Sequence, residues 1–418
     1  MKKPILLLVK MMCVLLIILP LGGCWDKKEI EKRAYAIAIG LDKGKDDNLK
    51  ITYLISNPEY GSQQDGGGIS EPANEIITFE TGSLITAEPK ANIVVAKEVS
   101  YDLLRNIIVS EELARSKSFI RWMYDTTKEK DIRRDSFFIV TKEPASEFIM
   151  NNKPKLETRA HKYYDIIIRR NIEIGIIPHA DLNKYFRITE ADADLFLGIY
   201  ATTVHEKTET PNDKGDDILA GQLDISGETN QTQFIGSALF KEGKMIGKLT
   251  GEETRITYLL NNTADAPDII ASLTDPINEK YQMAVRITKL KNADIKINTK
   301  QRPAKIDVTV PMTVDVLSDH SMVNFASNKD KRKLLKQHLE KRFKEKMMEL
   351  VKRTQVEFKG EPFGWSLAAR KKFATIPEYE NFDWMKSYPD MDVNINVKIQ
   401  FGEFGRQSRL PKYQDVRD

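Results

Sequence analysis

Apolar residues in the first half of the chain follow strand-like and helix-like spacings in alternation. Residues 34–42 and 49–55 are apolar runs separated by a charged turn, which predicts two adjacent strands. Pro89 favours a helix start near that proline, within a helical pattern over about 84–98. This alternation predicts a mixed sheet with helices packed on it. The remaining patterns predict strands at 78–80, 107–109 and 136–141 and helices near 111–116, 118–129 and 144–151.

The second half of the chain is richer in strand patterns. Residues 234–240 and 245–249 flank Glu242-Gly243, a good two-residue hairpin turn because glycine tolerates a positive φ. Pro311 lies inside one of the longer patterns, so that strand is predicted to be an edge strand or to carry a bulge. The longer alternating patterns predict strands at 283–290, 294–299, 305–317 and about 391–401.

One long helix is predicted over residues 329–353. It carries eleven bases and four acids, a net charge of +7. We interpret it as a helix that packs its apolar stripe on the neighbouring sheet and turns a basic face to solvent. The alternative is that this face meets an anionic membrane surface or nucleic acid. The stripe consists of Leu335, Leu339, Phe343, Met347, Leu350 and Val351.

A polar connection divides these two halves. Residues 206–233 hold seven acids against two lysines and are otherwise mostly Thr, Asn, Gly and Gln. We interpret the segment as a linker or a long exposed connection. The predicted fold class is α+β with several domains, in which mixed sheets carry packed helices and the C-terminal domain is β-rich. The predicted organisation is a signal peptide at 1–23, an N-terminal α+β region at 24–205, a linker at 206–233 and a C-terminal α+β domain at 234–418.

The N-terminus has the pattern of an export signal. Three lysines in the first ten residues precede the uncharged run 11–21, which is too short for a comfortable membrane-spanning helix. Leu21, Gly22 and Gly23 then precede Cys24 and resemble a bacterial lipobox. This predicts a diacylglycerol group on the Cys24 thiol and cleavage just before it. The alternative is an uncleaved signal anchor with an incidental cysteine.

Cysteine usage and charge exclude several functions for the rest of the chain. The only other cysteine, Cys13, lies in the apolar run, so disulfides, thiolate nucleophiles and cysteine-based zinc sites are excluded beyond Cys24. The formal net charge is +3, and removing the three signal-peptide lysines leaves 61 bases against 61 acids. A neutral body is a poor general binder of nucleic acid.

No motif for enzyme chemistry stands in the sequence. The five histidines show no metal-ligand spacing, and no Walker A, G-x-S-x-G or G-x-G-x-x-G motif occurs. We therefore predict no catalytic residue, no metal site and no cofactor.

Several segments together resemble the Ger(x)C family. The stretch from Gly23-Cys24-Trp25-Asp26 to Glu29 is similar to the family's start, and 36–42 to its first strand. Residues 107–114 resemble its Ile/Ile/x/Ser-Glu-Glu-Leu-Ala segment, and 236–240 with 245–247 its Gly-x-Ala-x-Phe hairpin. Glu361-Pro362 departs from the family, which is expected to have an Asp-Ile type pair there.

The resemblance implies a function that the residues alone do not show. Members are lipoprotein C subunits of spore germinant receptors, held on the outer face of the spore's inner membrane. They work with an A-type subunit and a multi-spanning B-type subunit, without enzyme activity. The alternatives are a solute-binding lipoprotein of a membrane importer, which would need two similar lobes around a cleft, and an extracytoplasmic lipoprotein enzyme.

Overall fold

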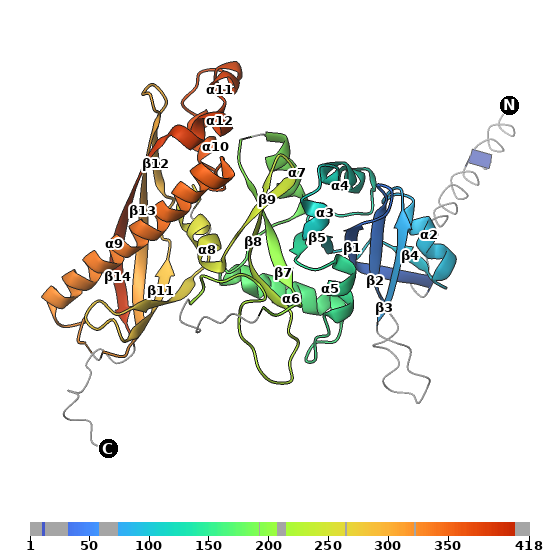
Figure 1. Cartoon of the computed structure of the whole chain (residues 1–418), viewed down its shortest axis with the longest axis horizontal. Coiled ribbons are helices and arrows are strands. Elements are labelled where there is room, and N and C mark those ends of the chain that lie inside the picture. The colour runs from blue at the N-terminus through green and yellow to red at the C-terminus, as the bar shows by residue number, and fades with distance from the viewer. Residues whose placement is uncertain are drawn as a thin grey trace, which may run out of the picture.

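Two sheets placed side by side along the long axis of the molecule carry the fold (Figure 1). Each sheet has its own cluster of buried apolar side chains. The multi-domain α+β class predicted from the sequence is confirmed. The computed structural model describes residues 11–12, 32–57, 74–191, 193–206, 215–263, 266–321 and 323–405.

The first sheet has nine strands in the order β3-β2-β1-β5-β6-β7-β8-β9, with β4 paired to β1. Its centre is parallel, because β1, β5, β6 and β7 run in one direction. Every strand predicted in this part of the chain is present, and β3 is longer than predicted. The strands are β1 (Arg33–Lys43), β2 (Leu49–Ser56), β3 (Asn74–Thr81), β4 (Glu98–Ser100), β5 (Asn106–Ser110), β6 (Phe137–Thr141), β7 (Phe196–Thr202), β8 (Gln233–Lys241) and β9 (Lys244–Leu249).

Helices cover this sheet as the alternation predicted. The first one starts at Ala87, close to Pro89 as predicted, so the proline lies in its first turn, and it ends at Val94 rather than near residue 98. Pro144 precedes α5 and offers no side-chain cap; instead the Asp42 carboxylate accepts from the Ala145 and Ser146 N–H groups at 2.7 and 2.9 Å. The helices are α2 (Ala87–Val94), α3 (Glu111–Ala114), α4 (Phe119–Lys128), α5 (Ala145–Asn151), α6 (Ala160–Glu173) and α7 (Leu182–Ala191).

The polar connection at 206–233 joins two neighbouring strands of one sheet. β7 before it and β8 after it pair antiparallel, with Phe196 opposite Phe240. Near its end, the Gln233 side chain accepts from the Gly221 N–H at 2.8 Å and ties the connection to β8. The chain therefore stays in the first sheet on both sides of the predicted linker. The chain leaves the first sheet only after β9, through α8 (Gly251–Leu260).

The second sheet has five strands in the order β10-β11-β13-β12, with β14 parallel to β13 on its other side. Pro311 does not mark an edge strand, because β13 is a central strand, but the predicted alternative of a bulge is found in β13, where its pairing with β11 shifts register between Val316 and Ser318. Pro311 lies between the stretch paired to β12 (Lys305–Thr309) and the stretch paired to β11 (Thr313–Asp319), so neither antiparallel ladder loses a donor. The strands are β10 (Ile269–Thr274), β11 (Gln282–Thr288), β12 (Asp294–Asn298), β13 (Lys305–Asp319) and β14 (Asp392–Phe404).

The predicted long helix is confirmed as α9 (Lys329–Arg353), which lies across the second sheet (Figure 1). Five of its six predicted stripe residues are buried and Phe343 is partly buried in the same cluster, so the stripe packs on the sheet. Glu340 accepts from the Ile399 N–H of β14 at 3.0 Å, which satisfies a donor on that strand. The elements between α9 and β14 are η6 (Thr354–Phe358), α10 (Trp365–Arg370), α11 (Ile376–Phe382), α12 (Trp384–Ser387) and η7 (Tyr388–Asp390).

Candidate functional site at the junction of the two sheets

The predicted lipidation site lies outside the described residues. Cys24 and the lipobox residues Leu21, Gly22 and Gly23 all precede Lys32, where the described body begins. Seven residues lie between Cys24 and Lys32, so a fully extended chain from Cys24 to Lys32 would span at most about 28 Å.

Two further findings concern membrane helices and metal ligands among the described residues. No helix among them has both the length and the apolar character needed to cross a membrane. In the same part of the chain, no three His, Cys, Asp or Glu side chains gather in a way that would hold a metal ion.

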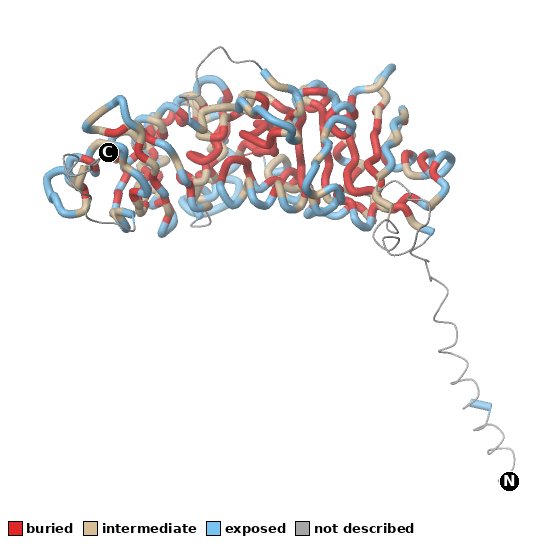
Figure 2. Tube along the Cα trace, turned by 90° about the horizontal axis from the view of Figure 1, so that it is seen from below, coloured by how far each residue is buried: buried red, intermediate tan, exposed pale blue. Residues whose placement is uncertain are grey.

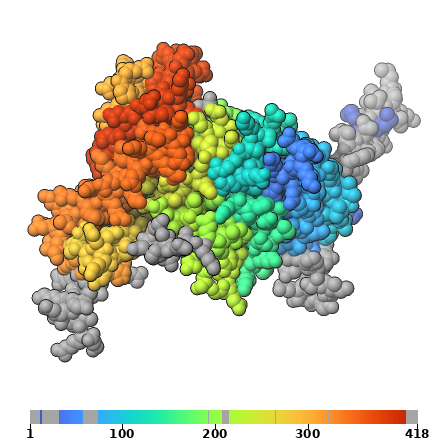
Figure 3. Space-filling view, in the orientation of Figure 1, coloured from blue at the N-terminus to red at the C-terminus, as the bar shows by residue number. Residues whose placement is uncertain are grey.

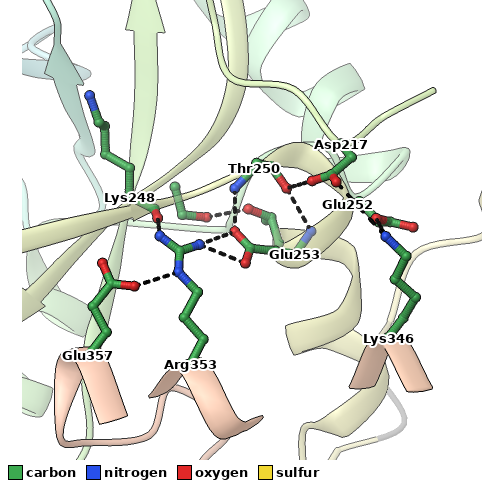
Figure 4. A network of polar contacts seen from close by, with 10 residues as sticks. Asp217, Lys248, Thr250, Glu252, Glu253, Lys346, Arg353 and Glu357 are labelled. Atoms are coloured by element: carbon green, nitrogen blue, oxygen red, sulfur yellow. Dashed lines mark hydrogen bonds and ion pairs between the residues drawn. The ribbon is translucent and has the colours of Figure 1, made fainter. Parts of the chain in front are cut away.

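Eight residues form a network where the two sheets meet, which we call the junction network (Figure 4). Its centre is Arg353, the last residue of α9. The Arg353 guanidinium donates to both Glu253 oxygens at 2.7 Å, to Glu357 at 2.8 Å and to the Lys248 carbonyl at 3.2 Å. The members are Asp217, Lys248, Thr250, Glu252, Glu253, Lys346, Arg353 and Glu357.

Local sequence places the acid that Arg353 binds. Thr250 caps α8: its hydroxyl accepts from the Glu253 N–H, and the Glu253 carboxylate accepts from the Thr250 N–H at 2.9 Å. The carboxylate is thus fixed at the helix N-terminus before it meets α9. Burial lowers the pKa of Arg353, but the hydrogen bonds to Glu357 and Glu253 outweigh burial and raise the pKa above its ordinary value.

Lys346 provides a second contact between α9 and α8. Its ammonium lies 2.9 Å from Glu252 and 3.9 Å from Asp217. Asp217 also accepts from the Thr250 hydroxyl at 2.9 Å. Burial lowers the pKa of Lys346, but the Glu252 carboxylate more than compensates, so the pKa is raised and the side chain stays charged.

The network continues into the first sheet through Lys248 of β9. Its ammonium lies 3.3 Å from the Glu111 carboxylate and 3.3 Å from the Tyr200 hydroxyl. Tyr200 in turn donates to Glu111 at 2.9 Å. Burial would raise the pKa of Glu111, but its partners Arg115 and Lys248 hold the pKa below the ordinary value. Paired charges therefore extend from α3 to the end of α9.

The other end of α8 is held by the second sheet. Lys289, just after β11, donates to the carbonyls of Tyr258, Asn261 and Thr263 at 3.1, 2.6 and 2.6 Å. A cation at a helix C-terminus complements the free carbonyls there. Trp365 is fully buried and donates its indole N–H to the Leu260 carbonyl at 3.0 Å. Both ends of α8 are thus tied to elements of the second sheet.

Glu361, where the sequence departs from the family pattern, is fully buried at this junction. Its carboxylate accepts from the Phe363 and Ser366 N–H groups at 2.6 and 2.9 Å. Its carbonyl accepts from the Leu195 N–H at 2.9 Å, beside Asp194. Burial raises the pKa of both carboxyls, and the charge of Asp194 raises that of Glu361 further. Glu361 therefore keeps a proton well above the ordinary range of a glutamic acid.

A cavity of about 440 Å³ opens beside the junction network, between α8, α9, β10 and β11. Apolar side chains line part of it, including Leu259, Phe343 and Met347. Its charged lining is balanced, with three acids and three bases. Such a mixed lining can hold an amphipathic group. The charged residues are Asp216, Asp217, Glu252, Arg255, Arg342 and Lys346.

The sequence reasoning missed the junction, although one local signal was available. Thr250-Gly251-Glu252-Glu253 is the pattern of a capping box, which predicts a helix start at this point. Arg353 could not be paired with Glu253 in this way, because 100 residues separate them. Only the folded chain brings the two together.

Comparisons with known proteins find similarity to spore germination proteins in both halves of the chain. The family model described as "Spore germination protein N-terminal domain" matches residues 26–202, and "Spore germination B3/ GerAC like, C-terminal" matches residues 235–405. "Spore germination protein KC" of Bacillus subtilis (strain 168) is 24% identical over 98% of each chain. "Putative spore germination protein YfkR" of the same organism is 22% identical over 92% of this chain and 94% of its own.

A solved structure has the same fold. The crystal structure of the GerBC protein aligns with a TM-score of 0.52 at 16% identity, and the match covers 90% of this chain and 99% of that one. Together with the two family models, which match most of the chain, this confirms the resemblance that the sequence predicted. The chain belongs to the Ger(x)C family of spore germination proteins.

Proposed function

We propose that this protein is the lipid-anchored C subunit of a spore nutrient germinant receptor. It is held by Cys24 to the outer face of the spore's inner membrane. It acts without enzyme chemistry, through contacts with an A-type subunit and a multi-spanning B-type subunit. The observation that carries the proposal is the family match in both halves of a chain in which a lipobox is predicted at residues 21–24.

Tethering supports a mechanism based on protein contacts. A lipid anchor confines the body to the membrane surface, where its partners reside. Confinement of this kind raises apparent affinity by about 10² to 10⁴ without new contacts. Contacts too weak to persist in solution therefore suffice in the membrane. Ion pairs and hydrogen bonds at the junction of the two sheets give the surface presented to partners a defined arrangement.

The importer alternative is not supported by the architecture. A solute-binding lipoprotein would need two similar α/β lobes facing a cleft. Here one sheet has nine strands with a parallel centre, and the other has five strands crossed by one long helix. The germinant-receptor proposal is therefore preferred.

The test compares the two cysteines of the chain. With Cys24→Ala we expect loss of radioactive fatty-acid labelling and a large loss of nutrient-triggered germination, because the body is no longer tethered. Cys13→Ala is the matched control: it removes the other thiol of the same N-terminal segment. It should keep both labelling and germination.

Two outcomes would contradict the proposal. Unchanged labelling of the Cys24→Ala protein would remove the anchor assignment. Full germination from an unlabelled protein at normal abundance would remove the role of tethering. Circular dichroism of both purified variants checks that each still folds.

A further inference from the structure

A second, strongly basic groove lies far from the junction network. It has a volume of about 720 Å³ and runs between the N-terminal half of α9 and the strands β13 and β14. We call it the basic groove. Its lining residues with a charge are all bases: Lys291, Lys329, Arg332, Lys333, Lys336 and Lys398.

The bases of the groove are largely uncompensated. Lys336 pairs with Glu340 at 3.8 Å. Within the described ranges, the side chains of the other five make no ion pair or hydrogen bond. Elsewhere on α9, Lys346 and Arg353 bind acids of α8 and Lys341 pairs with Glu345, whereas Lys331, Arg342, Lys344 and Lys352 make no ion pair among the described residues. The groove differs because its α9 bases face Lys291 and Lys398 of other elements, and its lining contains no acid.

Apolar side chains accompany these bases. Leu290 is 55% exposed at the groove. Pro311 and Phe401 also line it and are partly exposed. Positive charge combined with exposed apolar surface matches a ligand that has an anionic group on an apolar body.

We propose that the basic groove binds the phosphate headgroups of anionic lipids in a bilayer surface. Clusters of four to eight Lys or Arg are typical of sites for such surfaces, and the groove has six. We choose the bilayer over nucleic acid because the mature chain is neutral as a whole. The predicted anchor would also hold the body beside a bilayer, whose surface carries many anionic groups. The choice of a bilayer therefore rests on the proposed function.

The position of the groove defines what the contact does. Figure 3 shows α9 on the surface at one end of the molecule, and the first strands, which follow the anchor in the chain, at the other end. A second contact at the far end would lay the long axis of the body along the bilayer. A single anchor would leave that axis free to rotate.

The test measures binding to lipid vesicles without the anchor. The chain from Trp25 to Asp418 is suitable because both core clusters draw all their residues from between Ala34 and Ile399. It should co-sediment with vesicles of phosphatidylglycerol and phosphatidylcholine, and not with phosphatidylcholine alone. Binding should fall as salt is raised, because exposed charges are screened.

Two variants with the same change in net charge locate the contact. Lys333→Glu with Lys398→Glu reverses two exposed, unpaired bases of the groove and should weaken vesicle binding at least about tenfold. Lys341→Glu with Lys344→Glu reverses two exposed bases of the same helix outside the groove. We expect this control to weaken binding less than about threefold, through long-range charge alone.

Several results would overturn the inference. They are equal losses in the two variants, no binding to anionic vesicles at low salt, release by inorganic phosphate at constant ionic strength, or preferential binding of single-stranded DNA through the groove. The assay contains no lipid anchor, so its failure leaves the assignment of Cys24 standing. Loss of that assignment would likewise leave the vesicle result unchanged.

Discussion

The two sheets of this molecule bury their side chains in different ways. In the first sheet every residue of β5, β6 and β7 is buried, as in a parallel sheet covered on both faces. In the second sheet β13 alternates between buried and half-buried residues along most of its length. Figure 2 shows buried residues concentrated in the first region and interspersed with exposed ones in the second.

The two regions also differ in what covers their sheets. The first sheet is covered by helices, and its interior is a dense aromatic cluster that includes Phe138 and Tyr185. The second sheet leaves one face half-exposed and is crossed by a helix whose outer side is basic. The first region therefore contains the larger of the two buried clusters, and the second region carries the long basic helix. Three measurements test this comparison.

The largest effect is expected in the aromatic core of the first region. Phe138 is fully buried, and its ring lies 4.9 Å from that of Tyr185 and 5.3 Å from that of Phe240. Phe138→Ala should lower the free energy of unfolding by about 3–5 kcal/mol, through lost burial and a cavity. Denaturant unfolding, monitored by circular dichroism, measures this free energy of unfolding.

A matched surface change in the same region provides the control for Phe138→Ala. Leu156 is fully exposed, so Leu156→Ala should change the free energy of unfolding by less than about 0.5 kcal/mol. A cost at Phe138 no larger than the cost of Leu339→Ala, in the buried stripe of α9, would show that the first core is not the denser one.

The second effect concerns the junction network. Arg353→Met removes the hydrogen bonds to Glu253, Glu357 and the Lys248 carbonyl. The Arg353 side chain is 34% exposed, so solvent screening limits the expected cost to about 1–2 kcal/mol. A double-mutant cycle with Glu253→Gln isolates the contribution of this pair.

An exposed ion pair in the first region is the control for that cycle. Arg169 pairs with Asp165 at 2.7 Å, with side chains 57% and 46% exposed. Arg169→Met should cost less than about 0.5 kcal/mol. Coupling between Arg353 and Glu253 as small as that of the surface pair would mean that the junction network does not hold the two regions together.

The smallest effect is a pH dependence at the contact between Asp194 and Glu361. The folded-state pKa of Glu361 is raised, so its contribution to stability is full below the ordinary pKa of 4.5 and is lost as pH rises through the folded-state value. In the Glu361→Gln variant, stability should fall less as pH rises. Thermal unfolding between acid and neutral pH measures this dependence.

Glu157→Gln serves as the control for this pH dependence. Glu157 is partly exposed, and its hydrogen bond to Arg159 lowers its pKa to about 2, so above about pH 5.5 it is ionised in both the folded and the unfolded protein. The variant should keep the wild-type profile above about pH 5.5. If Glu361→Gln also keeps that profile, the buried carboxyl does not titrate as the structure indicates.

The sequence by itself determined many of the local elements and the family, although it did not predict α6, α7, β7, α8 or β10. The apolar stripe of residues 329–353 predicted α9 with its observed bounds, because helical periodicity depends on neighbours three and four positions away. Glu242-Gly243 predicted the hairpin of β8 and β9, and both residues have positive φ, 51° and 75°. Cys24 and the residues before it indicated an anchor, which stays a prediction.

Only the tertiary structure decided how these elements combine. Polar composition at 206–233 suggested a linker, yet β7 and β8 on its two sides are partners, since strand pairing depends on burial and not on the connection. Pro311 suggested an edge or a bulge; β13 is a central strand with a bulge between Val316 and Ser318, and two short strands share one of its sides and leave a gap at the proline. The junction network and the basic groove join residues far apart in the chain, so local patterns indicate only the start of α8 and the basic character of α9.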